Sequence, residues 1–364
     1  MIRYGFLLSA GLLAALCFAC VQQQPPPPPP QAPAAMSGYA APMRRLVAAC
    51  DQSNPITFLR RTYMLAAGYD PDPDHMNHTL PSGARPLPDP YCTSLTDVYS
   101  AASPSFRNQL DSLSATFIID DSQCPTVSAC VQDSWGLRDR ATKRTFVALS
   151  SGLWNNGPPK YSDFQRSVIS GLLGQNSPIT INVNPDNATM TVLAALAHEL
   201  GHVSWWKNSV EHTSCFNEPT PVFADISWII HDDRTPKFQY FGKERRYDPA
   251  HPGAGGNYPK GGVDKDKIIA DYGSPQLNND LAVIYNGEWA SIFATVTPDE
   301  DFVETYVLAA LIPAMQATLP QGQNLSFQIV LPSGQTVDLL GYSGNSNLDL
   351  YQKIQWIKDK DCII

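Results

Sequence analysis

The longest helical pattern in the sequence runs from Asn187 to Lys207 and constrains the fold more than any other feature. Asn187 is a candidate N-cap, because its side chain can accept a hydrogen bond from the first turn. Such a helix needs a core, which the chain can supply: 43% of its 364 residues are hydrophobic and only 16% are charged. That composition excludes a disordered chain and a coiled coil. The apolar face expected to pack on the core consists of Val192, Leu193, Leu196, Leu200 and Val203.

This helix contains the sequence HELGH, in which His198 and His202 are one turn apart and Glu199 stands between them. Imidazoles at positions i and i+4 lie on one face about 6 Å apart, which suits two positions of a tetrahedral zinc site. The carboxylate of Glu199 is then offset toward a water on the metal. An elongated motif with a third histidine is excluded, because Trp205 and Asn208 occupy the positions where it needs glycine and histidine.

A catalytic zinc site takes a third protein ligand, and two glutamates compete for that position. Glu300 opens a second predicted helix and has Glu304 four residues later on the same face. One carboxylate of this pair can bind the metal while the other orients a ligating histidine. Glu218 is the alternative, although Pro219 beside it disfavours a regular helix. We favour Glu300. The neighbouring acids fit a helix N-terminus, where they complement the helix dipole: Asp299 and Asp301.

The HELGH sequence followed by a distal EDFxE segment resembles the gluzincin branch of zinc metallopeptidases, closest to the lethal-factor-like and bacterial zinc-binding peptidase groups. The resemblance covers residues 179–206 and 293–306. It implies an α+β, zincin-like fold, with a small mixed sheet packed on the active-site helix and a helical C-terminal part. It further implies that His198, His202 and Glu300 bind one Zn²⁺, that Glu199 is the general base, and that Glu304 orients a ligand.

The resemblance implies a zinc-dependent endopeptidase whose partner is a peptide or protein substrate. It also implies that residues 179–184 form an edge strand that pairs with an extended peptide. One position departs from the family: Phe293 stands where a tyrosine often stabilises the oxyanion, so Tyr285 or another group must supply that donor. The alternative is a catalytically silent zincin-fold binding or scaffold protein at the cell envelope.

Other segments show weaker patterns. Residues 115–119, 144–149 and 179–184 are rich in β-branched residues and predict strands. Residues 162–173 predict a helix capped by Ser162 or Asp163. Further helices are expected over residues 298–318 and 347–358, with a hairpin at 325–340 between them. The Gly-, Pro- and Asp-rich residues 232–280 predict an irregular insertion.

The N-terminal residues have one cation at Arg3 and an apolar run of about 15 residues, which fits a signal peptide better than a membrane-spanning helix. We expect residues 1–19 to be a signal peptide and Cys20 to be the acylated cysteine of a lipoprotein; plain secretion or an uncleaved anchor is the alternative. Residues 20–43, with six consecutive prolines, predict a linker or a disordered tail. We expect residues 44–364 to form one domain. The chain is therefore expected to be exported, either lipid-anchored at a bacterial cell envelope, in the periplasm or at the surface, or secreted.

Beyond the first twenty residues six cysteines remain, an even number that is consistent with up to three disulfides in an exported chain. The sequence leaves 15 connectivities open, and Cys124–Cys130 is the pair we favour because a short turn-prone segment separates them. The formal net charge of −9 and the lack of a Lys/Arg-rich run disfavour a nucleic-acid partner. The sequence does not predict an oligomeric state.

Overall fold

The structure is a computed structural model. It describes residues 46–51, 53–65, 85–87, 89–119, 135–138, 144–155, 157–210, 223–229, 258–259 and 262–359. The expected signal peptide, Cys20, the expected linker, Cys124 and Cys130 of the favoured disulfide, and Glu218 lie outside these ranges.

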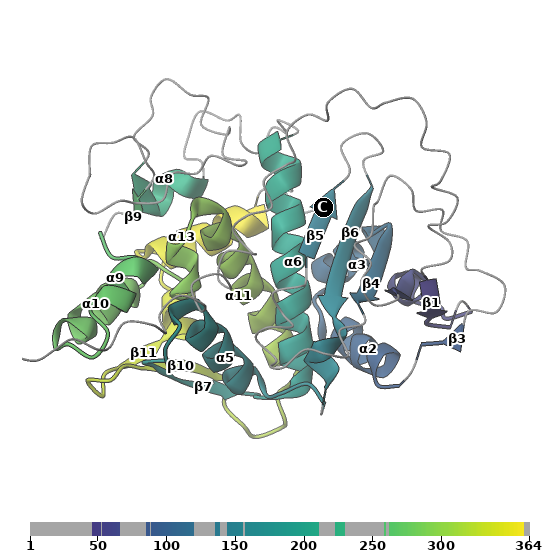
Figure 1. The fold of residues 1–364 in the computed structure, drawn as a ribbon, viewed down its shortest axis with the longest axis horizontal. Coiled ribbons are helices and arrows are strands. Elements are labelled where there is room, and N and C mark those ends of the chain that lie inside the picture. Colours follow the sequence, from purple (N-terminus) through teal and green to yellow (C-terminus); the bar gives the residue numbers. More distant parts are fainter. Residues whose placement is uncertain are drawn as a thin grey trace, which may run out of the picture.

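Helix α6 (Ala188–Val210) runs through the centre of the molecule, with a six-stranded sheet on one side and helix α11 (Pro298–Thr318) on the other (Figure 1). The side chain of Asn187 accepts a hydrogen bond from Met190 N at 3.1 Å, so the predicted N-cap is confirmed. The most extensive contact between any two described elements joins α6 to α11. The two helices that carry the candidate ligands therefore pack directly against each other.

The six-stranded sheet has the order β3-β1-β2-β4-β6-β5 and is mixed. Its central strands β2, β4 and β6 are parallel, whereas β1 runs antiparallel to β2 and β5 antiparallel to β6. Strand β6 is buried along its whole length, as its central apolar run at residues 146–149 requires when both faces of a sheet are covered. The strands are β1 (Leu46–Ala49), β2 (Thr62–Leu65), β3 (Arg85–Pro86), β4 (Ala115–Ile119), β5 (Trp135–Arg138) and β6 (Thr145–Ser150).

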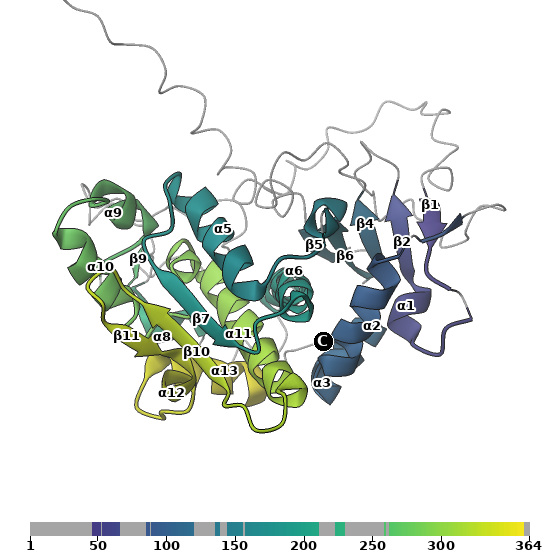
Figure 2. The same cartoon turned by 90° about the horizontal axis from the view of Figure 1, so that it is seen from below.

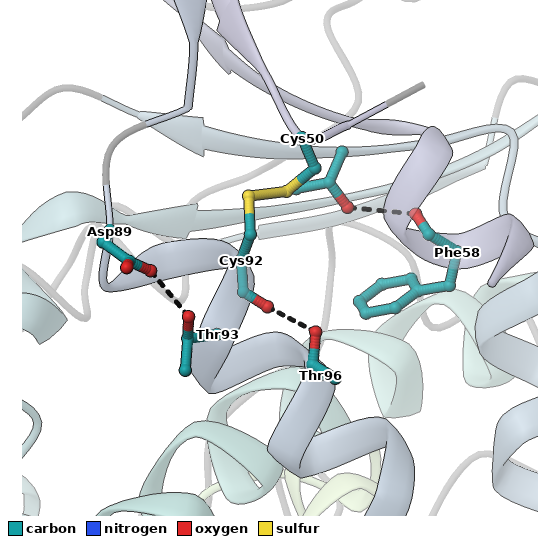
Figure 3. The surroundings of a disulfide bond; sticks show 7 residues. Cys50, Phe58, Asp89, Cys92, Thr93 and Thr96 are labelled. Carbon is teal, nitrogen blue, oxygen red and sulfur yellow. Dashed lines mark hydrogen bonds between the residues drawn. A yellow bond between two sulfur atoms is a disulfide. The ribbon is translucent and has the colours of Figure 1, made fainter. Parts of the chain in front are cut away.

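Three helices cover one face of this sheet (Figure 2): α1 (Thr57–Arg60), α2 (Tyr91–Ala101) and α3 (Pro104–Ser112). Helix α2 also packs on α6, and it is joined to the end of β1 by a disulfide between Cys50 and Cys92 (Figure 3). The sequence leaves the pairing of the cysteines open. Cys50–Cys92 is the disulfide found among the described residues.

On the other side of α6 lies a three-stranded antiparallel sheet with the order β11-β10-β7. Its strands are β7 (Thr180–Asn184), β10 (Ser326–Val330) and β11 (Thr336–Asp338). Helix α5 (Tyr161–Leu173) packs on β7, and Ile181, Phe327 and Ile329 are buried on the inner face. Within the described residues β7 pairs only with β10, so it is an edge strand that leads directly into α6.

The remaining elements are the 3-10 helices η3 (Ser151–Trp154) and η4 (Phe293–Thr295), the helices α8 (Phe223–Ser227), α9 (Lys265–Ala270), α10 (Gln276–Ile284), α12 (Leu339–Ser343) and α13 (Asp349–Asp359), and the short pair β8 (Trp228–Ile229) and β9 (Tyr258–Pro259). Among these elements, η3 directly follows β6 on the side of the six-stranded sheet, and α13 packs against α11. Buried apolar side chains from both sides of α6 form one contiguous core.

The structure is of the α+β class with a small mixed sheet, as expected. The strands predicted at 115–119, 144–149 and 179–184, the hairpin at 325–340 and the helices at 298–318 and 347–358 are confirmed within two residues. The cap predicted for α5 is wrong, because this helix starts earlier, with Lys160 at the N-cap and no capping side chain. The prediction that residues 232–280 are irregular is wrong for the C-terminal part of that range, where α9 and the start of α10 form. No helix in the described ranges is long and apolar enough to cross a membrane.

Candidate metal centre

Helix α6 places His198 and His202 side by side on one face. Their ring centroids are 4.9 Å apart and their Nε2 atoms approach to 3.2 Å. The spacing of four residues in a regular helix produces this geometry directly. Each side chain is about one-fifth exposed, so both rings are held by the protein yet can be reached from solvent.

The first turn of α11 brings Glu300 to the same point. Thr297 caps this helix by accepting a hydrogen bond from Glu300 N, and Pro298 occupies the first turn, where a missing N–H costs nothing. The two carboxylate oxygens of Glu300 lie 3.8 Å from His202 Nε2 and 3.9 Å from His198 Nε2. One ligand atom from each of the three residues falls within 4.8 Å of the others.

The burial of Glu300 shows that this cluster fits a metal ion. The residue is 3% exposed, and its Oε2 atom is buried without a hydrogen-bond partner among the described residues. A buried carboxylate oxygen in that condition is costly unless a cation satisfies it. His198, His202 and Glu300 therefore form a group that could hold a metal ion. Glu218, the alternative third ligand, lies outside the described residues.

Each of the two histidines has its own carboxylate on the opposite ring nitrogen. Glu304 Oε1 lies 3.2 Å from Nδ1 of His198, as the spacing of the two glutamates predicts. Asp299 Oδ2 lies 3.4 Å from Nδ1 of His202. A carboxylate at Nδ1 favours a proton there, which leaves the Nε2 lone pair free for a metal.

The role of Asp299 is not found by sequence reasoning, which assigns this residue to the helix dipole. Its partner comes from another helix, more than ninety positions earlier in the chain, so no local spacing reveals it. Ser291 is likewise missed. Its hydroxyl donates to Glu304 Oε2 at 2.6 Å and accepts a hydrogen bond from Ala294 N at 3.2 Å, which fixes the carboxylate that faces His198.

The charges in the cluster shift its pKa values. Burial lowers the pKa of His202, but Asp299 and Glu300 outweigh that effect and raise it to about 10. Burial lowers the pKa of His198 too, but the hydrogen bond that the ring donates to Glu304 and the nearby carboxylates outweigh that effect and raise the pKa. Burial raises the pKa of Glu300 to about 7, although both histidines oppose the shift. Without a metal the cluster therefore holds protons at neutral pH, and a divalent cation has to displace them.

Glu199 is buried on α6 directly after His198, and its negative charge is among the influences that raise the pKa of both histidines. The structure places Phe293 near the cluster too, with its ring centroid 5.8 Å from that of His198.

Tyr285, the other candidate for a hydroxyl donor, is buried, and burial raises its pKa. With Tyr161, Ser291 and Glu304 it lines a cavity of about 20 Å³, enough for a single water molecule. Tyr285 therefore lies near Glu304. That its hydroxyl donates a hydrogen bond to a substrate stays a prediction.

Comparisons of the chain with models of known protein families, with curated proteins and with solved structures find no match.

Proposed function

We propose that this protein is a zinc-dependent peptidase of the gluzincin type, with a zincin-like fold. The observation that carries the proposal is the convergence at one point of two imidazole Nε2 atoms and a buried carboxylate oxygen that has no hydrogen-bond partner among the described residues. Two nitrogens and one oxygen leave the fourth tetrahedral position open, which is the ligand set typical of catalytic rather than structural zinc.

The chain's own residues divide the chemistry between them. His198, His202 and Glu300 would hold the ion, which when bound lowers the pKa of a coordinated water to about 7 and polarises a carbonyl group. Glu199 accepts the proton of the attacking water and passes it to the amine of the leaving fragment. Asp299 and Glu304 keep the Nδ1 protons of the two histidines in place, and Ser291 fixes Glu304.

An extended polypeptide is the substrate that this arrangement suits. Strand β7 lies directly before α6 in the chain, and the edge of β7 that pairs with no described strand offers backbone groups to which a peptide strand can pair. Its residues alternate between exposed Thr180 and Asn182 and buried Ile181, so side chains of a bound peptide would meet polar neighbours on the outer face.

A catalytically silent binding or scaffold protein is the second candidate, and Phe293 favours it. The ring of Phe293 lies beside His198, and it has no hydroxyl with which to donate a hydrogen bond to a developing oxyanion. A chain of this kind would still bind zinc but would hydrolyse peptides slowly or not at all.

Metal content and peptide cleavage of the purified protein separate these possibilities. We expect about one zinc per chain and cleavage of an unstructured protein such as casein. His202→Ala should lose both properties, whereas Glu199→Gln should keep the zinc and lose cleavage. Zinc without cleavage of any library peptide favours the silent protein, and absence of zinc from the wild-type chain contradicts both candidates.

We further propose that the protein is exported and held at a bacterial cell envelope by a lipid on Cys20. The Cys50–Cys92 disulfide supports export, because such bonds persist in oxidising compartments. Mass spectrometry of the membrane fraction tests the anchor: the lipid mass should be lost and the protein released in Cys20→Ser.

A further inference from the structure

A buried lysine of the last described helix contacts the first turn of α11, which carries Glu300. Lys353 of α13 is 0% exposed, although Lys side chains are almost never fully buried unless paired. Its Nζ lies 2.9 Å from Asp301 Oδ1 and donates a second hydrogen bond to the backbone oxygen of Glu288 at 2.8 Å. The same ammonium stands 4.1 Å from the centroid of the Trp289 ring, in a cation–π contact.

Asp301, the partner of Lys353, is also 0% exposed and directly follows the candidate ligand Glu300. Its second oxygen accepts a hydrogen bond from Trp228 Nε1 at 3.1 Å. Burial lowers the pKa of Lys353 and raises that of Asp301, so solvent loss opposes the charged state of both groups. A buried ion pair gives little net stability, and well-packed apolar residues often serve as well. Stability alone therefore does not explain why Lys353 and Asp301 form a buried ion pair here.

The two hydrogen bonds of Lys353 join the two segments that complete the candidate centre. One reaches the first turn of α11, which supplies Asp299 and Glu300. The other reaches the backbone at Glu288, three residues before Ser291. Ser291 in turn holds Glu304, and Glu304 holds His198. A single ammonium thus fixes the distance between the third ligand and the segment that orients the first histidine.

We infer that Lys353 is a positioning residue of the metal centre: from the C-terminal helix it fixes Glu300 and the Ser291–Glu304 pair relative to His198 without touching the metal. This inference rests on the proposed metal-binding function. It assigns the C-terminal helix a part in metal binding although α13 contributes no ligand.

Lys353→Met tests this role, because methionine keeps most of the side-chain volume and removes the charge and both hydrogen bonds. The test uses the full-length protein at a temperature at which each variant is folded, as judged by circular dichroism. Two quantities are measured: the rate at which a chelator removes zinc, and hydrogen exchange of residues 288–304 in the metal-free protein. We expect zinc to leave about 10-fold faster and these residues to exchange faster.

Two controls separate positioning from general stability. Lys358→Met removes an exposed lysine of the same helix and should change neither quantity. Leu59→Ala removes a fully buried side chain in α1, which packs on α2 and α3, and should cost about 2–5 kcal/mol. It should lower the melting temperature without a selective effect on residues 288–304 or on zinc release.

A milder variant keeps the test informative if Lys353→Met does not fold. Trp228→Phe removes the indole hydrogen bond to Asp301, keeps an aromatic ring beside Trp289, and should change both quantities in the same direction by a smaller factor. The inference is overturned if the folded variants release zinc at the wild-type rate, or if Leu59→Ala releases it as fast as they do. A wild-type chain that binds no zinc overturns the proposed function and this inference together.

Discussion

Gly201 faces Val303 where α6 packs on α11, with no room between them for a side chain at position 201. A β-carbon at Gly201 would lie 3.1 Å from Val303 Cα and 3.2 to 3.3 Å from its two methyl carbons. Gly201 stands between His198 and His202, and Val303 stands between Glu300 and Glu304. The absence of a side chain at Gly201 therefore sets how closely the ligands of one helix approach those of the other.

Gly201→Ala should push the helices apart by a few tenths of an ångström and lower zinc affinity about 10-fold. Stability should change little, because alanine gains about 1 kcal/mol of helix propensity over glycine and this offsets the strain. Competition with a chelator measures the affinity, and thermal melting measures the stability. Val303→Ala in the same chain removes the two methyl contacts and should restore part of the affinity. Unchanged affinity in Gly201→Ala would show that this contact does not set the ligand geometry.

The two helices of the centre could be predicted from the sequence because each carries its own local signals. Asn187 is both the predicted and the observed N-cap of α6, and α11 begins at Pro298 as predicted. Glu300 is favoured over Glu218 because Glu304 lies on its helical face and Pro219 adjoins Glu218, and the resemblance to a family implies the same ligand. Asp299 could not be assigned, since only the packing of α11 on α6 brings it to His202.

The carboxylates of Glu304 and Asp299, which contact the two histidines, should affect zinc affinity more than the stability of the fold. Glu304→Gln and Asp299→Asn keep the shape and remove the charge, and each should lower zinc affinity about 10- to 100-fold. Asp163→Asn is the matched control, because this exposed carboxylate lies on α5 and pairs only with its neighbour Arg166 among the described contacts. Zinc affinities within twofold of wild type for both variants would contradict the assignment.

Stability of the metal-free protein should fall as pH rises. The pKa of Glu300 is raised from 4.5 to about 7 and that of His202 from 6.5 to about 10, so the folded state binds these protons more tightly than the unfolded state. The Glu300 contribution is full below pH 4.5 and is lost as pH rises through about 7. The His202 contribution is full below pH 6.5 and is lost as pH rises through about 10.

Melting temperatures in excess chelator, from pH 5 to 10, measure this loss. His202→Ala should have a flatter profile above pH 6.5, and equal slopes for both proteins would refute the assignment. Zinc should bind more tightly at higher pH in the wild-type chain, because it displaces the same protons.

The Cys50–Cys92 disulfide should stabilise the part of the molecule that contains the six-stranded sheet, which supplies no candidate metal ligand. Cys50 and Cys92 are 42 residues apart, and chain-entropy arguments give about 4 kcal/mol for closing such a loop. The double replacement by alanine should lower the melting temperature by about 10 °C and leave zinc content unchanged. Loss of zinc in the folded variant would show that the bridge also supports the metal centre.

Most of the six-stranded sheet could not be predicted from the sequence. Strands β4 and β6 are five and six residues long, whereas β1, β2, β3 and β5 are two to four residues long. Strands of that length contain too few alternations to be told from loops. The parallel pairing of β2, β4 and β6 places strands together that are far apart in the chain, and no local pattern reports it.

Phe293→Tyr decides between the two candidate functions. The Phe293 ring lies beside His198, so a hydroxyl at its edge would be near the site where a scissile carbonyl must be polarised. Loss of one oxyanion donor typically costs about 100- to 1000-fold in kcat. If the chain lacks this donor and is otherwise a peptidase, the added hydroxyl should raise kcat with little change in KM or zinc content. If Tyr285 already donates, Tyr285→Phe should lower kcat and Phe293→Tyr should have little effect. A chain that cleaves no peptide with either residue at position 293, while binding zinc normally, is better explained as a binding protein.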